Sequence, residues 1–580
     1  MCIYYYNDRG RIVMIQYSRE VLRKTLILPI SVMICVVFGF FLLMTLPAEA
    51  HGLYKEKPRF TQELFQRGEV LYQKQCSVCH GPEGRGDGQA EYLLYPKPRD
   101  FAGDKFRLIS TTSQQATDED LFKVIERGMA GSSMPPWKHL SETDRWALVY
   151  YVRYLSEVDD YIQAGDITVD MVEKGLPWEW LDKIVNNNID LNHIITTPEE
   201  PKATRKGLNR GRELFVASCA GCHGAEGRGD GQQNMVDGKG LPTRPRDLTA
   251  GVFKADSSSE ELYFRMVAGI PGSPMPSYTG VFTPEQIWDL IHFVQSLVPP
   301  GKEEKAPLKH TQITAHKVTG EIDTNPVAGR WADIKPIDVA LTPLWWRDGR
   351  IEGVDVRAVY NEDKIAVLLS WDDPQRDDNI VEVQSFTDGA ALQFSADEDP
   401  PFFGMGSAEH PVSIWHWKAA WEQEKDRRQD VETHYSNMAT DSFDTQVNYE
   451  HGSQFDISKS ETRFHDPKYI TGWGAGNPLS DPNREKETAE EATAEGLGSY
   501  TSQRPKIEHV KARGVWADGK WHVVFVRPLN PSGKDSLQFK PGESASIAFA
   551  IWDGAGGDRN GQKMVSIWNQ FILENRVDDK

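Results

Sequence analysis

Four of the six cysteines in this 580-residue chain lie in two C-x-x-C-H strings, Cys76 to His80 and Cys219 to His223. Two thiols at this spacing can form a redox dithiol, supply half of a zinc site, or bond to the two vinyl groups of a haem whose iron the adjacent histidine binds. A zinc site would need a second C-x-x-C in the same module, and the sequence has none. We therefore expect covalent haem c at both strings, with Cys76, Cys79, Cys219 and Cys222 as attachment points and His80 and His223 as axial ligands.

A haem iron with one histidine ligand needs a sixth ligand if it is to carry electrons without binding substrates. Met134 and Met275 each lie some fifty residues after a C-x-x-C-H string, beside proline. Met129 and Met266 lie nearby, but they do not occupy equivalent positions after the two strings. We predict that Met134 and Met275 complete His/Met coordination, which raises the reduction potential.

The two strings belong to a longer internal repeat. Position 219 repeats position 76 after 143 residues, a spacing typical of duplicated domains. A glycine-rich string follows each histidine, and Pro-Arg-Asp recurs at Pro98 to Asp100 and Pro245 to Asp247. The glycines lack the Lys-Ser/Thr ending of a phosphate-binding loop, so we interpret them as the loop after a haem-attachment helix.

Helices must position these ligands. Apolar spacing predicts an opening helix in each module, over 64–71 and 208–216. Ser141 and Thr283 precede acidic or proline-containing first turns and predict the start of a closing helix in each. This pattern resembles two class I cytochrome c domains, at residues 60–157 and 205–299, joined by a linker over 158–204.

The longest apolar run covers residues 25–46 and follows Arg19, Arg23 and Lys24. The basic flank and the small residues after the run indicate an export signal within residues 1–50, read either as a cleaved peptide or as a membrane anchor. Both readings send the rest of the chain across the membrane, which predicts a periplasmic location.

Composition limits the choice of partners. The net charge is −20, so a nucleic-acid partner would be repelled over most of the surface. We therefore expect no nucleic acid, and a basic redox protein would be attracted instead.

The last part of the chain has no cysteine, and its sequence pattern changes from helical to strand-like. After a linker over 300–329, twelve of the seventeen tryptophans follow residue 330. Compact β-rich runs at 354–360, 364–371, 521–526 and 544–552 predict an all-β sandwich over 330–575. The polar stretch from Glu422 to about Lys506 is too long for a hairpin loop.

Several strings give this region a family resemblance. They include Gly404-Met405-Gly406, Pro411 to Lys418, Gly476 to Ser480 and Lys563 to Trp568. The region resembles the haem-binding gamma subunit of ethylbenzene dehydrogenase and its relatives in the DMSO reductase family of molybdoenzymes, including dimethylsulfide, selenate, chlorate and nitrite-oxidising enzymes. The resemblance implies one non-covalent haem b with Met405 and Lys563 as its axial ligands.

Other residues compete for these two roles. Met564 adjoins Lys563, and His416 lies between two tryptophans. A lysine ligand must also be a neutral amine, so burial and the iron must both lower its proton affinity. We rank Met405 and Lys563 first because the resemblance nominates them.

Two covalent haems c and one haem b would make the chain an electron relay. The resemblance implies the iron–sulfur and molybdenum subunits of a DMSO reductase family enzyme as partners on one side. A soluble cytochrome or a membrane oxidase would be the partner on the other side. The alternative is a dihaem cytochrome c with a carbohydrate-binding sandwich, which requires exposed, coplanar aromatic side chains. A peroxidase-like enzyme would need an open haem, and the paired methionines argue against it.

Overall fold

A computed structural model describes residues 2–6, 12–16, 57–186, 193–301, 308–347, 349–379, 382, 384–397, 400, 404–425, 437, 488–503, 510–531 and 537–575. The chain forms two compact units, Met1–Arg59 and Phe60–Lys580. In the first unit, β1 (Cys2–Tyr6) pairs antiparallel with β2 (Ile12–Gln16). The apolar run at 25–46, with Cys35, lies outside the described residues. Within the part of the chain that is described, no helix combines the length and hydrophobicity needed to cross a membrane.

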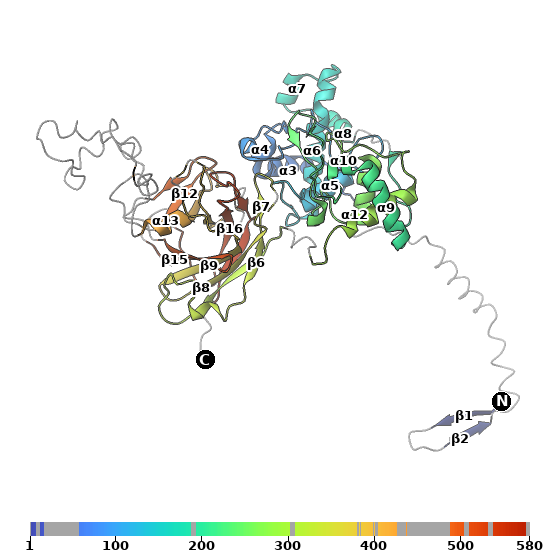
Figure 1. The fold of residues 1–580 in the computed structure, drawn as a ribbon. Coiled ribbons are helices and arrows are strands. Elements are labelled where there is room, and N and C mark those ends of the chain that lie inside the picture. The colour runs from blue at the N-terminus through green and yellow to red at the C-terminus, as the bar shows by residue number, and fades with distance from the viewer. Residues whose placement is uncertain are drawn as a thin grey trace, which may run out of the picture. The chain divides into compact units, whose positions relative to one another are not determined.

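The second unit begins with a helical region and continues into a large β-sheet domain (Figure 1). The helical region contains α3 (Gln62–Gln75), α4 (Ser77–His80), α5 (Asp118–Arg127), α6 (Glu142–Gln163), α7 (Val169–Glu173), α8 (Trp178–Val185), α9 (Arg205–Ser218), α10 (Ala220–His223), α11 (Ser259–Ala268) and α12 (Pro284–Ser296). Single-turn 3-10 helices lie at Glu91–Leu93 and Leu248–Ala250, and β3 (Met235–Val236) pairs with β4 (Pro242–Thr243).

The repeat in the sequence is a repeat in structure. In each copy an opening helix crosses the closing helix, α3 against α6 and α9 against α12, and a glycine lies at each crossing. A Cβ atom on Gly68 would lie 2.1 Å from the Ala147 carbonyl oxygen, and one on Gly211 would lie 2.1 Å from the Asp289 carbonyl oxygen. Because no side chain fits there, the helices pack backbone against backbone.

The helix starts follow the sequence signals. The Ser141 hydroxyl accepts a hydrogen bond from the Asp144 N–H at the start of α6. At α12, Thr283 and Gln286 form a reciprocal capping box, with Pro284 at the first helical position. The expected segment 158–204 contains the end of α6 and the helices α7 and α8. Trp178 of α8 stacks on Phe60 at 4.9 Å between ring centroids, so this segment packs on the first module.

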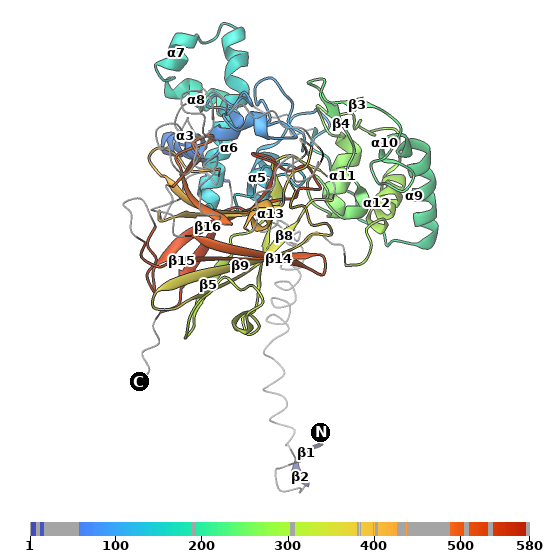
Figure 2. The same cartoon turned by 60° about the vertical axis from the view of Figure 1, so that its left-hand side comes forward.

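The β domain is a single fourteen-stranded sheet (Figure 2). Its strands are β5 (Gln312–Lys317), β6 (Ile337–Ala340), β7 (Thr342–Pro343), β8 (Gly353–Tyr360), β9 (Lys364–Asp372), β10 (Gly389–Ser395), β11 (Val412–Lys418), β12 (Ala489–Ala494), β13 (Thr501–Ser502), β14 (Lys511–Ala517), β15 (Lys520–Pro528), β16 (Ser544–Trp552), β17 (Met564–Val565) and β18 (Asn569–Leu573). The short helices are a 3-10 turn at Gly329–Trp331 and α13 (Ala419–Glu424). All pairs are antiparallel except β18 with β5 and β5 with β8. The strand β5 lies in the segment expected to be a linker.

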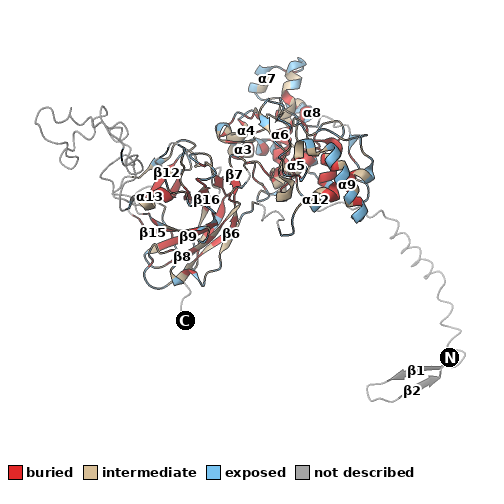
Figure 3. Ribbon diagram, in the orientation of Figure 1, coloured by how far each residue is buried: buried red, intermediate tan, exposed pale blue. Residues whose placement is uncertain are grey.

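Side chains from distant parts of the sheet share one core. Trp371 of β9, Trp417 of β11 and Trp521 of β15 lie 5.0–6.4 Å apart between ring centroids. Each is at most 2% exposed. Figure 3 shows the neighbouring strands β8 and β9 as largely buried. These tryptophans fill the interior, so they are not the exposed aromatic platform that carbohydrate binding would need. Most of the polar stretch after Glu422 lies outside the described residues.

Candidate haem sites

The first C-x-x-C-H string opens onto a cavity in the first module. Cys76 ends α3, and α4 turns His80 towards the same space that Met134 and Met129 line from the other side. The His80 Nδ1 atom lies 3.0 Å from the Arg99 carbonyl oxygen. With Nδ1–H donating to that carbonyl, Nε2 is the nitrogen left to bind a metal.

A short hydrogen-bonded loop presents each methionine. The Met134 N–H donates to the Ser132 hydroxyl at 3.3 Å, and that hydroxyl donates to the Met129 carbonyl at 2.7 Å. The Met275 N–H and the Ser273 hydroxyl repeat both contacts, at 3.3 Å to Ser273 and 2.7 Å to the Ile270 carbonyl. The loops at Met134 and Met275 are therefore equivalent in structure as well as in sequence.

The glycine-rich strings pack against the attachment helices. A Cβ atom on Gly88 would lie 2.4 Å from the Val78 carbonyl oxygen, and one on Gly231 would lie 2.3 Å from the Cys222 carbonyl oxygen. The Gly86 N–H also donates to the His80 carbonyl at 2.8 Å. These contacts fit a loop that covers the haem-attachment helix, and they leave few free N–H groups for a phosphate.

The second cavity has the same plan. Cys219, Cys222 and His223 line it together with Met275 and Met266. Within the described chain the buried Nδ1 atom of His223 has no hydrogen-bond partner.

The residues of both cavities fit a covalently bound haem. Each cavity brings together two thiols, one imidazole and one loop methionine, which are the groups that attach and ligate haem c. Met129 and Met266 also line the cavities, but they lie at non-equivalent positions in the repeat. When bound, haem c supplies a one-electron centre, and these side chains would hold the iron and keep substrates from it.

In the β domain, the outer face of β10, β11, β12 and β16 carries a second apolar cluster. The inner-facing residues of these strands belong to the tryptophan-rich core, and the alternate residues face outwards. The buried members of this cluster are Ala391, Val412, Ile414, Ala492, Ala494 and Ala548, together with Trp568. The four alanines leave space over the sheet that larger side chains would fill, and such space fits a planar macrocycle.

Both nominated haem b ligands adjoin this face. Met405 packs against this apolar cluster. Its backbone φ is +82°, in the left-handed region that residues other than glycine rarely adopt. Lys563 places its Nζ atom 4.9 Å from the ring centroid of Trp552, which packs against the same cluster. Burial lowers the pKa of Lys563 to about 8, the direction that a neutral amine ligand requires.

His416 lies on this face too. Its ring is 5.2 Å from that of Trp552, and its Nδ1 atom lies 3.4 Å from a Glu490 carboxylate oxygen. Burial lowers the pKa of His416 to about 4. Although burial opposes ionisation of Glu490, hydrogen bonds from His416, Ser502 and Tyr500 lower its pKa to about 2. Glu490 is a pairing partner that the sequence alone did not suggest.

A short strand joins the first cytochrome module to the β domain. The Ser133 hydroxyl, next to Met134, donates to the Leu344 carbonyl at 2.9 Å. The strand β7 ends beside Leu344 and pairs with β17, and the Leu344 N–H donates to the Lys563 carbonyl at 3.0 Å. The loop of Met134 and Lys563, which directly precedes β17, are thus linked by hydrogen bonds through Leu344. No motif marks this link, because β7 is only two residues long.

Comparisons with known proteins agree with this architecture. Residues 328–564 match the family model "Ethylbenzene dehydrogenase", residues 208–298 match "Cytochrome c", and residues 63–152 match "Cytochrome C oxidase, cbb3-type, subunit III". A Haloferax mediterranei protein named as a respiratory nitrate reductase haem subunit is 25% identical over 42% of this chain and 67% of its own length.

Two further proteins are similar over comparable stretches. The dimethylsulfide dehydrogenase gamma subunit of Rhodovulum sulfidophilum is 26% identical over 37% of this chain, and the match spans only 57% of that relative. A chain from a Kuenenia stuttgartiensis reducing HAO-like protein complex is 30% identical over 42% of this chain and all of its own length, with a TM-score of 0.35. By the family models and the curated relatives, the chain is related to gamma and haem subunits of oxidoreductases. In this chain, cytochrome c-type regions precede an ethylbenzene dehydrogenase-type domain.

Proposed function

We propose that this protein is a three-haem electron-transfer subunit. Residues 60–157 and 205–299 would each carry one haem c, and the sandwich at 330–575 would carry one haem b. The segments 158–204 and 300–329 would connect them. The observation that carries the proposal is that two equivalent cavities join a C-x-x-C-H string to a methionine loop, in one compact unit with the ethylbenzene dehydrogenase-type domain.

The ligands would be His80 with Met134, His223 with Met275, and Met405 with Lys563. Filled coordination spheres suit single-electron transfer and exclude bond chemistry at the iron. The chain would pass electrons between the iron–sulfur subunit of a periplasmic DMSO reductase family molybdoenzyme and a soluble cytochrome or membrane oxidase. Residues 1–50 would direct export, as a cleaved signal or as an anchor.

The link through Leu344 supports an order for the relay. Because it joins the Met134 loop to the Lys563 backbone, haem b would exchange electrons with the first haem c. The haem c of the second module would then be the terminal centre on the cytochrome side.

A pyridine haemochrome spectrum of the purified full chain tests the haem content. We expect haem c and haem b in a ratio of two to one, and Met405→Ala should remove the b signal while both c signals remain. A spectrum with haem c alone in the wild-type chain would overturn the haem b assignment and with it the three-haem proposal.

A further inference from the structure

Three buried carboxylates from separate parts of the β domain lie close together. Asp373 follows β9, Asp388 precedes β10 and Asp553 follows β16. One oxygen of each lies within 4.8 Å of the others, and the three residues are 2%, 0% and 8% exposed. None of them is a proposed haem ligand. We call these three residues the aspartate triad.

Hydrogen bonds hold Asp388 at the centre of this arrangement. Its Oδ1 atom accepts from the Gly554 N–H at 2.9 Å. Its Oδ2 atom accepts from the Asp377 N–H at 2.7 Å and from the Trp521 indole N–H at 2.9 Å. Because a carboxylate has about four lone-pair sites, three hydrogen bonds still leave Asp388 able to bind a cation.

Asp373 differs because one of its oxygens lacks a partner. Its Oδ1 atom accepts from the Gln375 N–H at 3.2 Å, but its buried Oδ2 atom has no hydrogen-bond partner in the part of the chain that the structure describes. The Oδ2 atom of Asp377, whose N–H donates to Asp388, is also buried and has no hydrogen-bond partner among the described residues. Ionised oxygens in such positions are costly unless a cation reaches them.

The ion pairs around the triad leave negative charge over. The Arg347 Nη2 atom lies 2.7 Å from Asp553 Oδ2 and 3.1 Å from Asp558 Oδ2. Across the described ranges, Asp373 and Asp388 form no ion pair. In a solution without divalent cations, protons would offset the remaining charge, since burial raises the pKa of Asp373 to about 7 and that of Asp388 to about 8.

A cavity gives ions access to the triad. Asp373 and Asp553 line it, and it extends to the exposed Asp372. Negative side chains outnumber positive ones in its lining, so it attracts cations. The charged lining residues are Asp338, Glu352, Asp355, Asp372, Asp373 and Asp553, with Arg347, Arg350 and Lys520.

We propose that the aspartate triad binds one Ca²⁺ ion, which ties together the chain segments after β9, before β10 and after β16. Ca²⁺ takes six to eight oxygen ligands at about 2.3–2.6 Å, so two oxygens bound to one ion can lie up to about 5 Å apart. The spacing of the triad meets this limit. The carboxylates supply the anionic ligands, and water from the cavity completes the set.

Mg²⁺ fits the same site less well. It binds oxygen at about 2.0–2.1 Å in near-ideal octahedral geometry and loses its own water reluctantly. Three carboxylates fixed by their hydrogen bonds and by Arg347 cannot easily contract around it. The site should therefore prefer Ca²⁺.

Equilibrium dialysis of the full chain against Ca²⁺ at pH 8, after bound metal has been removed with a chelator, tests this assignment. We expect one bound Ca²⁺ per chain, retained in the presence of equal Mg²⁺. In Asp373→Asn the affinity should fall about tenfold or more, because one anionic ligand is lost. Asp372→Asn is the matched control, since it removes the same charge from the adjacent exposed residue, which pairs with Lys520 at 2.8 Å.

Thermal unfolding of the same samples gives a second readout. Ca²⁺ should raise the unfolding temperature of the wild-type chain and of Asp372→Asn, but not that of Asp373→Asn. The assignment is wrong if the wild-type chain shows no saturable Ca²⁺ binding, if Asp373→Asn binds equally well, or if Mg²⁺ binds with the same affinity. If Asp373→Asn does not fold, Asp373→Ser takes its place, and the same outcomes decide. Haem content is measured separately, so the two proposals stand or fall independently.

Discussion

Single substitutions can distinguish the proposed sixth iron ligands from the other methionines that line the same cavities. Met134 and Met129 line the same cavity, but only Met134 has an equivalent in the second module. We expect Met134→Ala to open one haem c to carbon monoxide in the reduced state and to lower its potential, because the thioether ligand is lost. A carbon monoxide difference spectrum measures this directly. Met129→Ala should leave the spectrum unchanged, and the reverse result would assign Met129 as the ligand.

At the level of elements, the helix crossings depend on glycine. Gly68 lets α3 contact the backbone of α6, so Gly68→Ala forces an overlap with the Ala147 carbonyl. We expect a loss of about 1–3 kcal/mol in the stability of the first module, as for other overpacked sites. Chemical denaturation followed by haem c absorbance measures it. Gly329→Ala is the control, because its added Cβ atom meets nothing within 4 Å, and an equal loss there would contradict the packing explanation.

Three buried carboxylates meet where strands of the β domain begin and end. Asp373 follows β9, Asp388 precedes β10, and Asp553 follows β16, with one oxygen of each within 4.8 Å of the others. Burial, and then Asp553, raise the pKa of Asp373 to about 7. Burial, and then Asp373, raise the pKa of Asp388 to about 8.

These raised values predict a pH dependence of stability. The folded chain holds protons that the unfolded chain releases above about pH 4, so the free energy of unfolding should fall as pH rises from about 4 to 8. In Asp373→Asn the free energy of unfolding should decrease less steeply with pH, because the amide does not ionise. The Asp373 Oδ2 atom that it replaces is buried and has no hydrogen-bond partner within the described residues. Thermal unfolding measured across this pH range is the test. An unchanged slope in the variant would show that Asp373 does not contribute.

For the whole molecule, the proposed relay order makes a kinetic prediction. If the first haem c lies between haem b and the second haem c, then Cys76→Ala with Cys79→Ala should stop transfer from haem b to the remaining haem c. The matched variant, Cys219→Ala with Cys222→Ala, should keep transfer from haem b to the first module. Rapid-mixing spectroscopy on chains that retain the haem b signal distinguishes the two. Retained transfer in the first variant would contradict the order.

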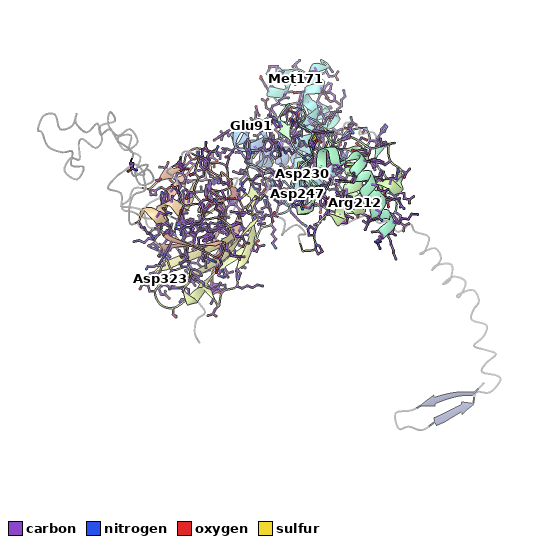
Figure 4. All side chains as sticks on the ribbon, viewed as in Figure 1. Glu91, Met171, Arg212, Asp230, Asp247 and Asp323 are labelled. Carbon is purple, nitrogen blue, oxygen red and sulfur yellow. The ribbon has the colours of Figure 1, made fainter. Side chains whose placement is uncertain are left out.

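Figure 4 shows how densely side chains fill the two parts of the second unit, and it labels Glu91 and Asp247 in the helical region. Both residues act locally, since Glu91 pairs with Lys97 at 2.8 Å and Asp247 caps the turn after the second Pro-Arg-Asp string. Such contacts over a few residues follow from sequence, whereas contacts between the modules do not.

The sequence by itself determined the chemistry that is local along the chain. The C-x-x-C-H strings and the caps at Ser141 and Thr283 could be identified because their residues lie within a few turns of one another. The repeat could be identified because these short strings recur in the same order after 143 residues. The β-rich runs were also predictable, since alternation and composition mark strands.

Only the tertiary structure decided how these parts meet. The contact of Arg246 with Gly131, the link through Leu344, and the grouping of Asp373, Asp388 and Asp553 join residues more than a hundred positions apart, or strands that pair out of order. Such contacts arise from the packing of complete domains and sheets. No short-range pattern of apolar spacing or turn residues encodes them.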